Sequence, residues 1–362
     1  MKKIMVYAYT HFNLGDDLFI KMLCERYPNV RFFLYAPGKY KNNFSNVKNI
    51  RIIPIESITF RAINYISRIL KIGYLFSREA IAKTCDAAVY IGGSLFIQGE
   101  NWESGIKNVK SMQIKNKPFF LLGVNFGPYK DMEYFNKYKE LFQGYTDICF
   151  REQYSFELFN DLSNVRIADD IVFQLRKPDI KTIGKNIVIS VIKPSVRKDL
   201  MDFDDIYYKK IKDISMYFIE KGYSITLMSF CELEGDEEAI ESILKLIPSD
   251  YKNKINEYLY KYNIDETLDI IAASNFVIAS RFHAMILGWV FNKPVFPIVY
   301  SSKMTNVMRD VGFNGLFTDF NTIEALQPEK VFECMKTNLI DVSNQVKNSE
   351  KHFEKLDEYL LN

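Results

Sequence analysis

Short apolar runs alternate with longer amphipathic segments along the first half of the chain. Runs of about four to eight apolar residues are typical of strands buried on both faces, and apolar positions spaced by three or four residues are typical of helices. The alternation predicts parallel βαβ units. The expected strands are 4–9, 32–36, 87–91, 119–124, 148–150 and 165–168, and the expected helices are 18–27, 104–115, 132–143 and 153–162.

A second series follows residues 176–185, where proline, glycine and basic residues interrupt the pattern. Its expected strands are 187–192, 224–230, 276–279 and 295–300, and its expected helices are 205–221, one that starts with the acidic stretch 234–238, and one that ends before 292. The pattern predicts an α/β fold of two doubly wound Rossmann-like domains facing a cleft. We expect the domains to be 1–180 and 186–327, with a charged helical tail, 328–362, that packs back on the first domain.

Charge and cysteine usage exclude several classes of protein. The chain has 47 basic and 45 acidic residues and a net charge of +2, so the composition gives no sign of a nucleic-acid partner. Its five cysteines are odd in number, scattered and free of any C-x-x-C pair. This usage is typical of reduced thiols in the cytoplasm and indicates neither a disulfide framework nor a zinc site, so we expect no metal.

One segment raises the question of a membrane contact. No stretch approaches the roughly 20 apolar residues of a membrane span. The amphipathic segment 58–78, however, places basic residues between apolar ones, and these are Arg61, Arg68, Lys71 and Arg78. The pattern fits a domain helix with a solvated face, and it also fits a helix that lies in the interface of a membrane.

The strongest candidate for chemistry lies between the strand 276–279 and the apolar helix that follows it. Arg281 and His283 occupy this junction. In a parallel sheet it is the carboxyl end of a strand and the first turn of a helix, where ligands bind and unpaired N–H groups attract anions. The competing interpretation is a core histidine and an arginine in an ordinary ion pair. Because the neighbours are apolar, the guanidinium needs a partner or a ligand.

Other polar residues follow other predicted strands. Asn13, Gly15 and Asp16 form a turn whose carboxylates favour a helix start and would repel a phosphate, so this is no phosphate-binding loop. Two interpretations of these polar residues are open: they cap the helix, or they form hydrogen bonds with sugar hydroxyls. Paired glycines allow a close backbone approach. The remaining strand-end candidates are Gly92 and Gly93, Arg151, Lys193 with Arg197, Ser280, and Lys303.

Together these motifs resemble the polysaccharide pyruvyltransferases. The matching residues are Asn13 to Asp16, Gly92-Gly93-Ser94 with Gln98, Gly123 to Pro128, Arg151-Glu152 with Ser155, Asp170 with Phe173, Ser280 to His283, and Lys303. They span residues 10–305, and their order along the chain is the specific part of the resemblance. Ser94 and Phe282 depart from the family, which commonly has glycine and leucine at these places.

The resemblance implies a fold similar to that of GT-B glycosyltransferases and transfer of pyruvate from phosphoenolpyruvate to two sugar hydroxyls as a cyclic ketal. It implies no further cofactor. Arg281 and His283 would be catalytic, and the donor would be bound by Arg151, Lys193, Lys303 and Ser280. We expect the second domain to form the donor side of the site. Asn13, Gly15, Asp16, Gly92 and Gly93 would bind the acceptor, on the side of the first domain.

We expect the acceptor to be a lipid-linked oligosaccharide of a capsule or exopolysaccharide, and the enzyme to work in the cytoplasm at the inner face of the membrane. Two alternatives remain open. A GT-B glycosyltransferase or a sugar-nucleotide epimerase also places basic residues at strand ends but binds a nucleotide. A non-catalytic scaffold of a glycan assembly complex would leave Arg281 and His283 dispensable.

Overall fold

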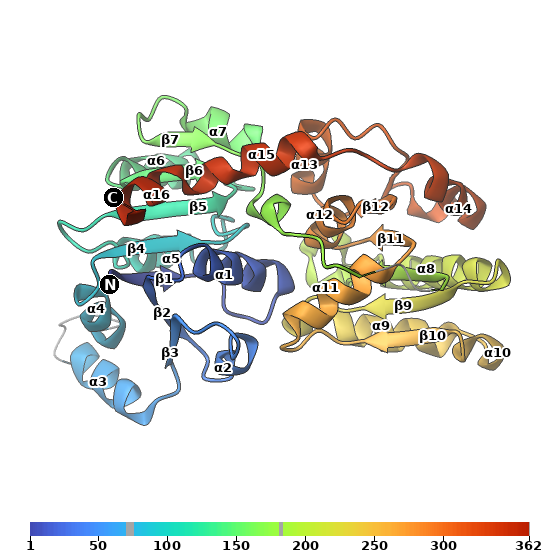
Figure 1. The fold of residues 1–362 in the computed structure, drawn as a ribbon, viewed down its shortest axis with the longest axis horizontal. Helices are drawn as coiled ribbons and strands as arrows, with labels where there is room; N and C mark the ends of the chain where they lie inside the picture. The colour runs from blue at the N-terminus through green and yellow to red at the C-terminus, as the bar shows by residue number, and fades with distance from the viewer. Residues whose placement is uncertain (70–75, 181–183, 362) are drawn as a thin grey trace. The chain divides into compact units, whose positions relative to one another are not determined.

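The computed structural model describes residues 1–69, 76–180 and 184–361 and divides into two compact units (Figure 1). The first unit comprises residues 1–10, 16–171 and 348–362, and the second comprises 11–15 and 172–347. The turn 11–15, which we expected in the first domain, therefore belongs to the second unit. The chain returns to the first unit at Asp16, within the first turn of a helix.

The first unit contains a parallel sheet of seven strands in the order β3-β2-β1-β4-β5-β6-β7, counted over the described residues. The strands are β1 (Lys3–Tyr7), β2 (Arg31–Ala36), β3 (Ile50–Pro54), β4 (Ala87–Ile91), β5 (Phe119–Val124), β6 (Asp147–Phe150) and β7 (Val165–Ile167). The helices are α1 (Leu14–Arg26), α2 (Tyr40–Asn43), α3 (Ile58–Ile69), α4 (Phe76–Lys83), α5 (Trp102–Lys110), α6 (Met132–Gln143), α7 (Gln153–Phe159) and α16 (Glu354–Leu361).

The second unit contains a parallel sheet of six strands in the order β10-β9-β8-β11-β12-β13, again within the described chain. The strands are β8 (Asn186–Ser190), β9 (Ser224–Met228), β10 (Ile255–Tyr258), β11 (Phe276–Ala279), β12 (Val295–Val299) and β13 (Thr318–Asp319). The helices are α8 (Asp204–Glu220), α9 (Asp236–Leu246), α10 (Ser249–Lys252), α11 (Ile264–Ala273), α12 (Phe282–Val290), α13 (Ser302–Asp310), α14 (Pro328–Thr337) and α15 (Ser343–Ser349), which continues into the first unit.

Alternate residues of the second sheet pack on opposite layers of helices. Ile187, Ile225, Phe276 and Phe296 point to one face, where they form a core with α8, α9 and α14. On the other face, α12 approaches the sheet so closely that a β-carbon at Gly288 would lie 2.5 Å from Val295. These two parallel, doubly wound sheets confirm the predicted α/β class.

The structure differs from the sequence-based expectation mainly at the edges of the two sheets and in the C-terminal segment. β3 and β10 were not expected, because edge strands carry polar residues and lack the continuous apolar run of a central strand. The helix α14 packs on α8 and β12 of the second unit, so the segment that joins the first unit starts near residue 348 and not at 328.

Among the described residues, no helix is long and apolar enough to cross a bilayer.

Arg166 fastens this C-terminal segment to the first sheet. Its guanidinium binds Asp147 with Nε at 2.6 Å and Nη2 at 2.9 Å, and it also donates to the backbone carbonyls of Lys351 and His352. His352 is fully buried beside this cation. Burial and the charge of Arg166 lower the pKa of His352 to about 3.

The buried histidine gives a testable pH dependence. An unfolded histidine binds a proton below pH 6.5, whereas His352 in the folded protein stays neutral, so its stabilising contribution is present above about pH 6.5 and is lost as the pH falls towards 3. We expect the free energy of unfolding to fall more steeply over this window in the wild type than in His352→Gln, by up to about 1.4 kcal/mol per pH unit. Urea unfolding at several pH values measures this, with the exposed His11→Gln as the control. Equal slopes in all three proteins would contradict the assignment.

Candidate functional site

Each sheet reverses its strand order at one point, and the predicted site residues follow the strands at these points. The reversal lies between β1 and β4 in the first unit and between β8 and β11 in the second. Ligands of open α/β sheets bind outside the carboxyl ends of the strands at such a point. The turn of Asn13 follows β1 and the glycine pair follows β4, the two strands at the first reversal. Lys193 and Arg197 follow β8 and Arg281 follows β11, the two strands at the second.

In the first unit the predicted residues gather around Arg151, which is only 4% exposed. Its Nη1 donates to Asp170 Oδ2 at 2.8 Å and its Nη2 donates to Asn125 Oδ1 at 2.7 Å. A β-carbon at Gly93 would lie 2.6 Å from both terminal nitrogens, so the guanidinium requires a glycine there. Arg151, a predicted donor residue, is thus paired within its own unit.

The neighbouring motif residues extend this network. Ser155 donates to Glu152 Oε1 at 2.7 Å and accepts a hydrogen bond from the backbone N–H of Phe126 at 2.8 Å. Asp16 Oδ1 accepts a hydrogen bond from the backbone N–H of Gly93 at 3.5 Å, and a β-carbon at Gly92 would lie 3.3 Å from the same oxygen. Asp16 and the glycine pair, three of the predicted acceptor residues, therefore lie together.

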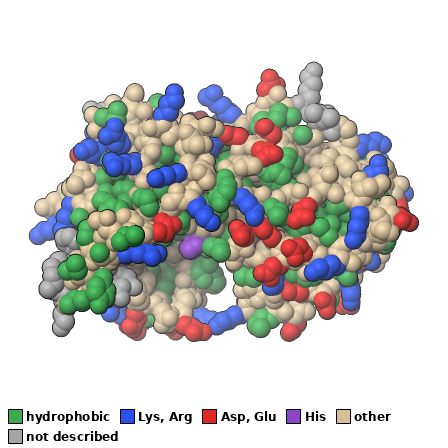
Figure 2. Space-filling view, turned by 90° about the horizontal axis from the view of Figure 1, so that it is seen from below, with side chains coloured by type: hydrophobic (Ala, Val, Ile, Leu, Met, Phe, Trp, Pro, Cys, Tyr) green, Lys and Arg blue, Asp and Glu red, His purple; other side chains and the backbone are tan. Residues whose placement is uncertain are grey.

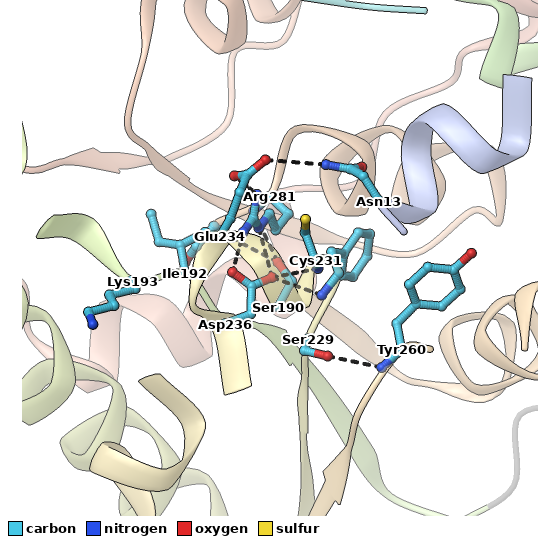
Figure 3. A network of polar contacts seen from close by, with 12 residues as sticks. Asn13, Ser190, Ile192, Lys193, Ser229, Cys231, Glu234, Asp236, Tyr260 and Arg281 are labelled. Carbon is cyan, nitrogen blue, oxygen red and sulfur yellow. Dashed lines mark hydrogen bonds and ion pairs between the residues drawn. The ribbon is translucent and has the colours of Figure 1, made fainter. Parts of the chain in front are cut away.

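In the second unit a buried ion pair organises the site (Figure 3). Arg281 Nε donates to Asp236 Oδ2 at 3.0 Å, Nη2 binds the other oxygen of Asp236, and Nη1 binds Glu234 Oε2. Burial acts to lower the pKa of Arg281, but the two carboxylates outweigh it and raise the pKa well above its ordinary value. The partner that the apolar surroundings of Arg281 demanded is supplied by this chain.

Glu234 lies among several cations. Its Oε2 also accepts a hydrogen bond from Arg197 Nη2 at 2.9 Å, and its Oε1 accepts one from Asn13 Nδ2 at 3.4 Å. Burial raises the pKa of Glu234, but Arg281, Arg197 and Lys303 together lower it to about 2. The carboxylate is therefore ionised throughout the physiological range.

Two cations lie close to the ring of Tyr300, which follows β12. The guanidinium of Arg197 lies 4.3 Å from the ring centroid of Tyr300, and the ammonium of Lys303 lies 5.2 Å from it. Burial acts to raise the pKa of Tyr300, but Lys303, Arg197 and Arg281 lower it below its ordinary value. The carboxyl ends of β8, β11 and β12 thus hold three cations around one site.

The other two predicted donor residues are used within the unit. Lys193 Nζ donates to Glu238 Oε2 at 2.5 Å, and its methylene groups pack on Gly235. Ser280 is fully buried, and its Oγ accepts a hydrogen bond from Tyr207 at 2.8 Å. Ser280 therefore shapes the turn that carries Arg281 and offers no exposed atom to a donor.

His283 lies in the first turn of α12 and is half-buried. Its ring packs over Gly15, where a β-carbon would lie 1.7 Å from Nδ1. The turn that carries Gly15 is fixed to the second unit, since Leu14 N donates to the carbonyl of Phe230 at 3.1 Å and Asn13 forms a bridge with Cys231. Asn13 and Gly15, predicted as acceptor residues, thus lie beside Glu234 and His283.

The family model of the polysaccharide pyruvyl transferases matches residues 13–302. The chain belongs to this family. The matched range includes the Asn13 turn, the network of Arg151, and Arg281 with His283, and it ends one residue before Lys303.

Among curated proteins, the amylovoran biosynthesis protein AmsJ of Erwinia amylovora is 22% identical, over 80% of this chain and 75% of its own. Solved structures resemble the fold at lower identity. HepE of Anabaena, in complex with UDP and glucose, has a TM-score of 0.57 at 13% identity and covers 99% of both chains. MnaA of Staphylococcus aureus, in complex with UDP, has a TM-score of 0.62 at 13% identity and covers 99% of this chain and 97% of its own. These structures confirm the likeness to GT-B folds.

Two acidic residues of the site were not predicted from the sequence as site residues. Glu234 and Asp236 were interpreted only as the start of a helix. Their position in the chain could have indicated this role. They follow β9, which neighbours β8 in the sheet, and so they lie at the same sheet edge as Arg281. Within the described residues, no group of three or more His, Cys, Asp and Glu side chains is arranged to hold a metal ion.

The contact between Gly15 and His283 gives a sharp test. In Gly15→Ala the new methyl group overlaps the imidazole, so the ring must leave its position. If His283 acts in catalysis, we expect kcat to fall at least tenfold while the melting temperature changes little. Gly105→Ala is the control, because it adds a methyl group to open space in the helix α5. Wild-type kcat in Gly15→Ala would show that the position of His283 is unimportant for turnover.

Proposed function

We propose that the protein transfers the pyruvyl group of phosphoenolpyruvate to two hydroxyls of a sugar in a surface-glycan intermediate and forms a cyclic ketal. Family membership supports pyruvyl transfer in polysaccharide synthesis. The observation that carries the donor is the group of Arg281, Arg197 and Lys303 at the strand ends of the second unit, beside His283. Phosphoenolpyruvate carries a carboxylate and a phosphate, and such cations recognise both.

The donor site in this proposal is formed by the cations at the strand ends of the second unit. Arg281 has five N–H donors, and its hydrogen bonds to Asp236 and Glu234 use three of them. Lys303 lies on the first turn of α13, where a helix terminus also favours an anion. Arg151 and Lys193, also predicted as donor residues, are paired with Asp170 and Glu238 and are not part of this donor site.

The chemistry needs a proton at the methylene carbon of the donor. Charged His283 delivers this proton, and the former C2 becomes a cationic centre that a first sugar hydroxyl attacks. Phosphate then leaves, and the second hydroxyl closes the ring. Each sugar hydroxyl loses one proton when it forms its bond to C2. One of these protons returns to His283 and the other goes to the departing phosphate, so the enzyme returns to its starting state.

The acceptor in this proposal is met by the turn of Asn13, Gly15 and Asp16 and by the glycine pair Gly92-Gly93. The amide and carboxylate groups of Asn13 and Asp16 suit neutral hydroxyls. We further propose that the acceptor is a lipid-linked oligosaccharide of capsule or exopolysaccharide assembly and that the reaction takes place in the cytoplasm. The proposal needs no cofactor besides the donor substrate.

Mass spectrometry and phosphate release test this function directly. The protein is incubated with phosphoenolpyruvate and extracted glycan intermediates, and we expect a pyruvyl mass increment on the glycan together with an equal amount of released phosphate. A thermal-shift comparison with UDP-sugars tests the competing chemistry. Stabilisation by a UDP-sugar and not by phosphoenolpyruvate, with no pyruvylated product, would contradict the proposal.

Replacement of the proton donor tests the mechanism. In His283→Asn the side chain keeps a polar group of similar shape but cannot carry the proton, so we expect kcat to fall by a factor of about 10² to 10⁴. The KM for phosphoenolpyruvate should change much less, because Arg281 and Lys303 remain. The control is His352→Gln, a histidine of the first unit that the mechanism does not use. Retention of more than about a tenth of kcat in His283→Asn would rule out the role.

A further inference from the structure

Glu234 differs from the other acidic partner of Arg281 in a way that suggests exchange. Asp236 is fully buried and accepts backbone hydrogen bonds from Phe230 at 2.8 Å and Cys231 at 3.0 Å. The side chain of Glu234 is 25% exposed, and its carboxylate accepts hydrogen bonds from the side chains of Arg281, Arg197 and Asn13. Asp236 is thus a fixed counter-ion, whereas the carboxylate of Glu234 is bound by Arg281 and Arg197, two cations that an incoming anion would also bind.

The backbone at Glu234 allows its carboxylate to move independently of Asp236. Glu234 ends a short 3₁₀ turn, Glu232–Glu234, and the next residue is Gly235 with a φ of +75°. A left-handed glycine separates the two acids, so rotation about the Glu234 side chain leaves Asp236 and α9 in place. The long glutamate side chain can therefore leave the cations without any change in the sheet.

The charges at the site fit one exchange. Arg281, Arg197 and Lys303 contribute three positive charges, and Glu234 and Asp236 contribute two negative ones. When Glu234 turns away, Arg281 keeps its pair with Asp236, and Arg197 loses its pair with Glu234. A donor that carries a carboxylate and a phosphate supplies the missing negative charge, and its oxygens can accept the hydrogen bonds that Glu234 gives up.

We propose that Glu234 is an internal substitute for the anionic donor: it occupies the cation site until phosphoenolpyruvate displaces it, and its departure releases Asn13. The inference rests on the proposed function. It assigns Glu234 a regulatory role, because Asn13, an expected acceptor residue, is bonded to the same carboxylate through its Nδ2. Donor binding then frees the amide for a sugar hydroxyl, so the donor binds first and the acceptor second.

Removal of one charge tests the exchange. Glu234→Gln keeps the shape of the side chain but removes its charge, so phosphoenolpyruvate meets less competition, and we expect its Kd to fall about tenfold, which corresponds to about 1.4 kcal/mol. Inorganic phosphate should bind more tightly as well. The matched control is Glu238→Gln, which makes the same change on α9 at a carboxylate that pairs with Lys193. Calorimetry gives the Kd values, and Glu234→Ala repeats the test if the glutamine variant is unstable.

Binding order provides the second readout. The wild type should bind the acceptor only in the presence of phosphoenolpyruvate or phosphate, whereas Glu234→Gln should bind it without either. If Glu234→Gln and Glu238→Gln bind phosphoenolpyruvate as the wild type does, the exchange is refuted while pyruvyl transfer stands. If no protein of the set binds phosphoenolpyruvate or forms a pyruvylated product, the proposed function itself fails.

An independent observation concerns α3 of the first unit. Four of its large apolar side chains are exposed: Ile58 by 85%, Tyr65 by 66%, Ile66 by 54% and Ile69 by 62%. Their spacing of seven, one and three residues places them along one side of the helix. Phe60 of the same helix packs against the core of the first unit. Within the described residues of the first unit, this second apolar side of the helix is therefore exposed.

The charge on this helix indicates what covers that side. Residues 58–69 contain no acidic residue, and Arg61 is exposed beside the apolar side chains. Hydrophobic side chains gather at the left end of the face in Figure 2, the end at which Figure 1 places α3. Of the other basic residues expected here, Arg78 is buried and donates to Asn108 Oδ1 at 3.0 Å, so it cannot serve the surface. Lys71 lies outside the described residues.

We infer that α3 docks on the surface of a bilayer that contains anionic lipids. Isoleucines would enter the boundary between headgroups and acyl chains, Tyr65 would lie at headgroup level, and Arg61 would meet lipid phosphate. Each basic residue near such a surface contributes attraction that salt screens. This arrangement would bring the enzyme to an acceptor that is anchored in lipid.

Vesicle sedimentation tests the surface. The wild type should sediment with phosphatidylglycerol-containing vesicles at low salt, less at high salt, and not with phosphatidylcholine alone. Ile58→Ser with Ile66→Ser should reduce the bound fraction at least fivefold. The control pair Met201→Ser with Leu339→Ser changes side chains of similar exposure, 62% and 59%, in the second unit and should bind normally. Absence of binding by the wild type, equal binding by the α3 variant, or a dimer that the α3 variant abolishes would overturn the inference.

Discussion

The bidentate pair between Arg281 and Asp236 is the constraint on which the site depends. A guanidinium with apolar neighbours is stable only with a partner, and removal of one member of such a pair costs about 3 to 5 kcal/mol. Asp236 begins α9 and Arg281 directly precedes α12, so the pair joins two loops that follow different strands. Because Asp236 also accepts two backbone hydrogen bonds, the pair fixes the geometry of the whole strand-end surface.

Glycines complete what the ion pairs begin. Gly93 lets the guanidinium of Arg151 approach the backbone, and Gly15 lets His283 lie over the turn of Asn13. At both places a methyl group would collide with a polar ring or fork, so these glycines are required by space and not by backbone conformation. In each unit a charged side chain is therefore held against a glycine turn at the point where the strand order reverses.

The sequence predicted the central strands well and the edges poorly. β4, β5 and β11 have the bounds expected from their apolar runs, since a strand buried on both faces has no polar positions to blur its ends. β10 carries Asn256 and Glu257 and was missed. The Arg281-His283 junction was visible because charged residues interrupt an apolar stretch, whereas its acidic partners come from a loop about 45 residues earlier and no local pattern links the two. For the same reason, the sequence could not reveal that residues 11–15 join the second unit.

The cations at the ends of β8, β11 and β12 are proposed to bind the donor, and a crystal structure of the protein with phosphoenolpyruvate would show whether they do. We expect the donor to lie within hydrogen-bond distance of Arg281 and Lys303, with its methylene carbon facing His283 and the Glu234 carboxylate turned away. A donor bound instead at Arg151 in the first unit, or one that leaves Glu234 on Arg281 and Arg197, would contradict it.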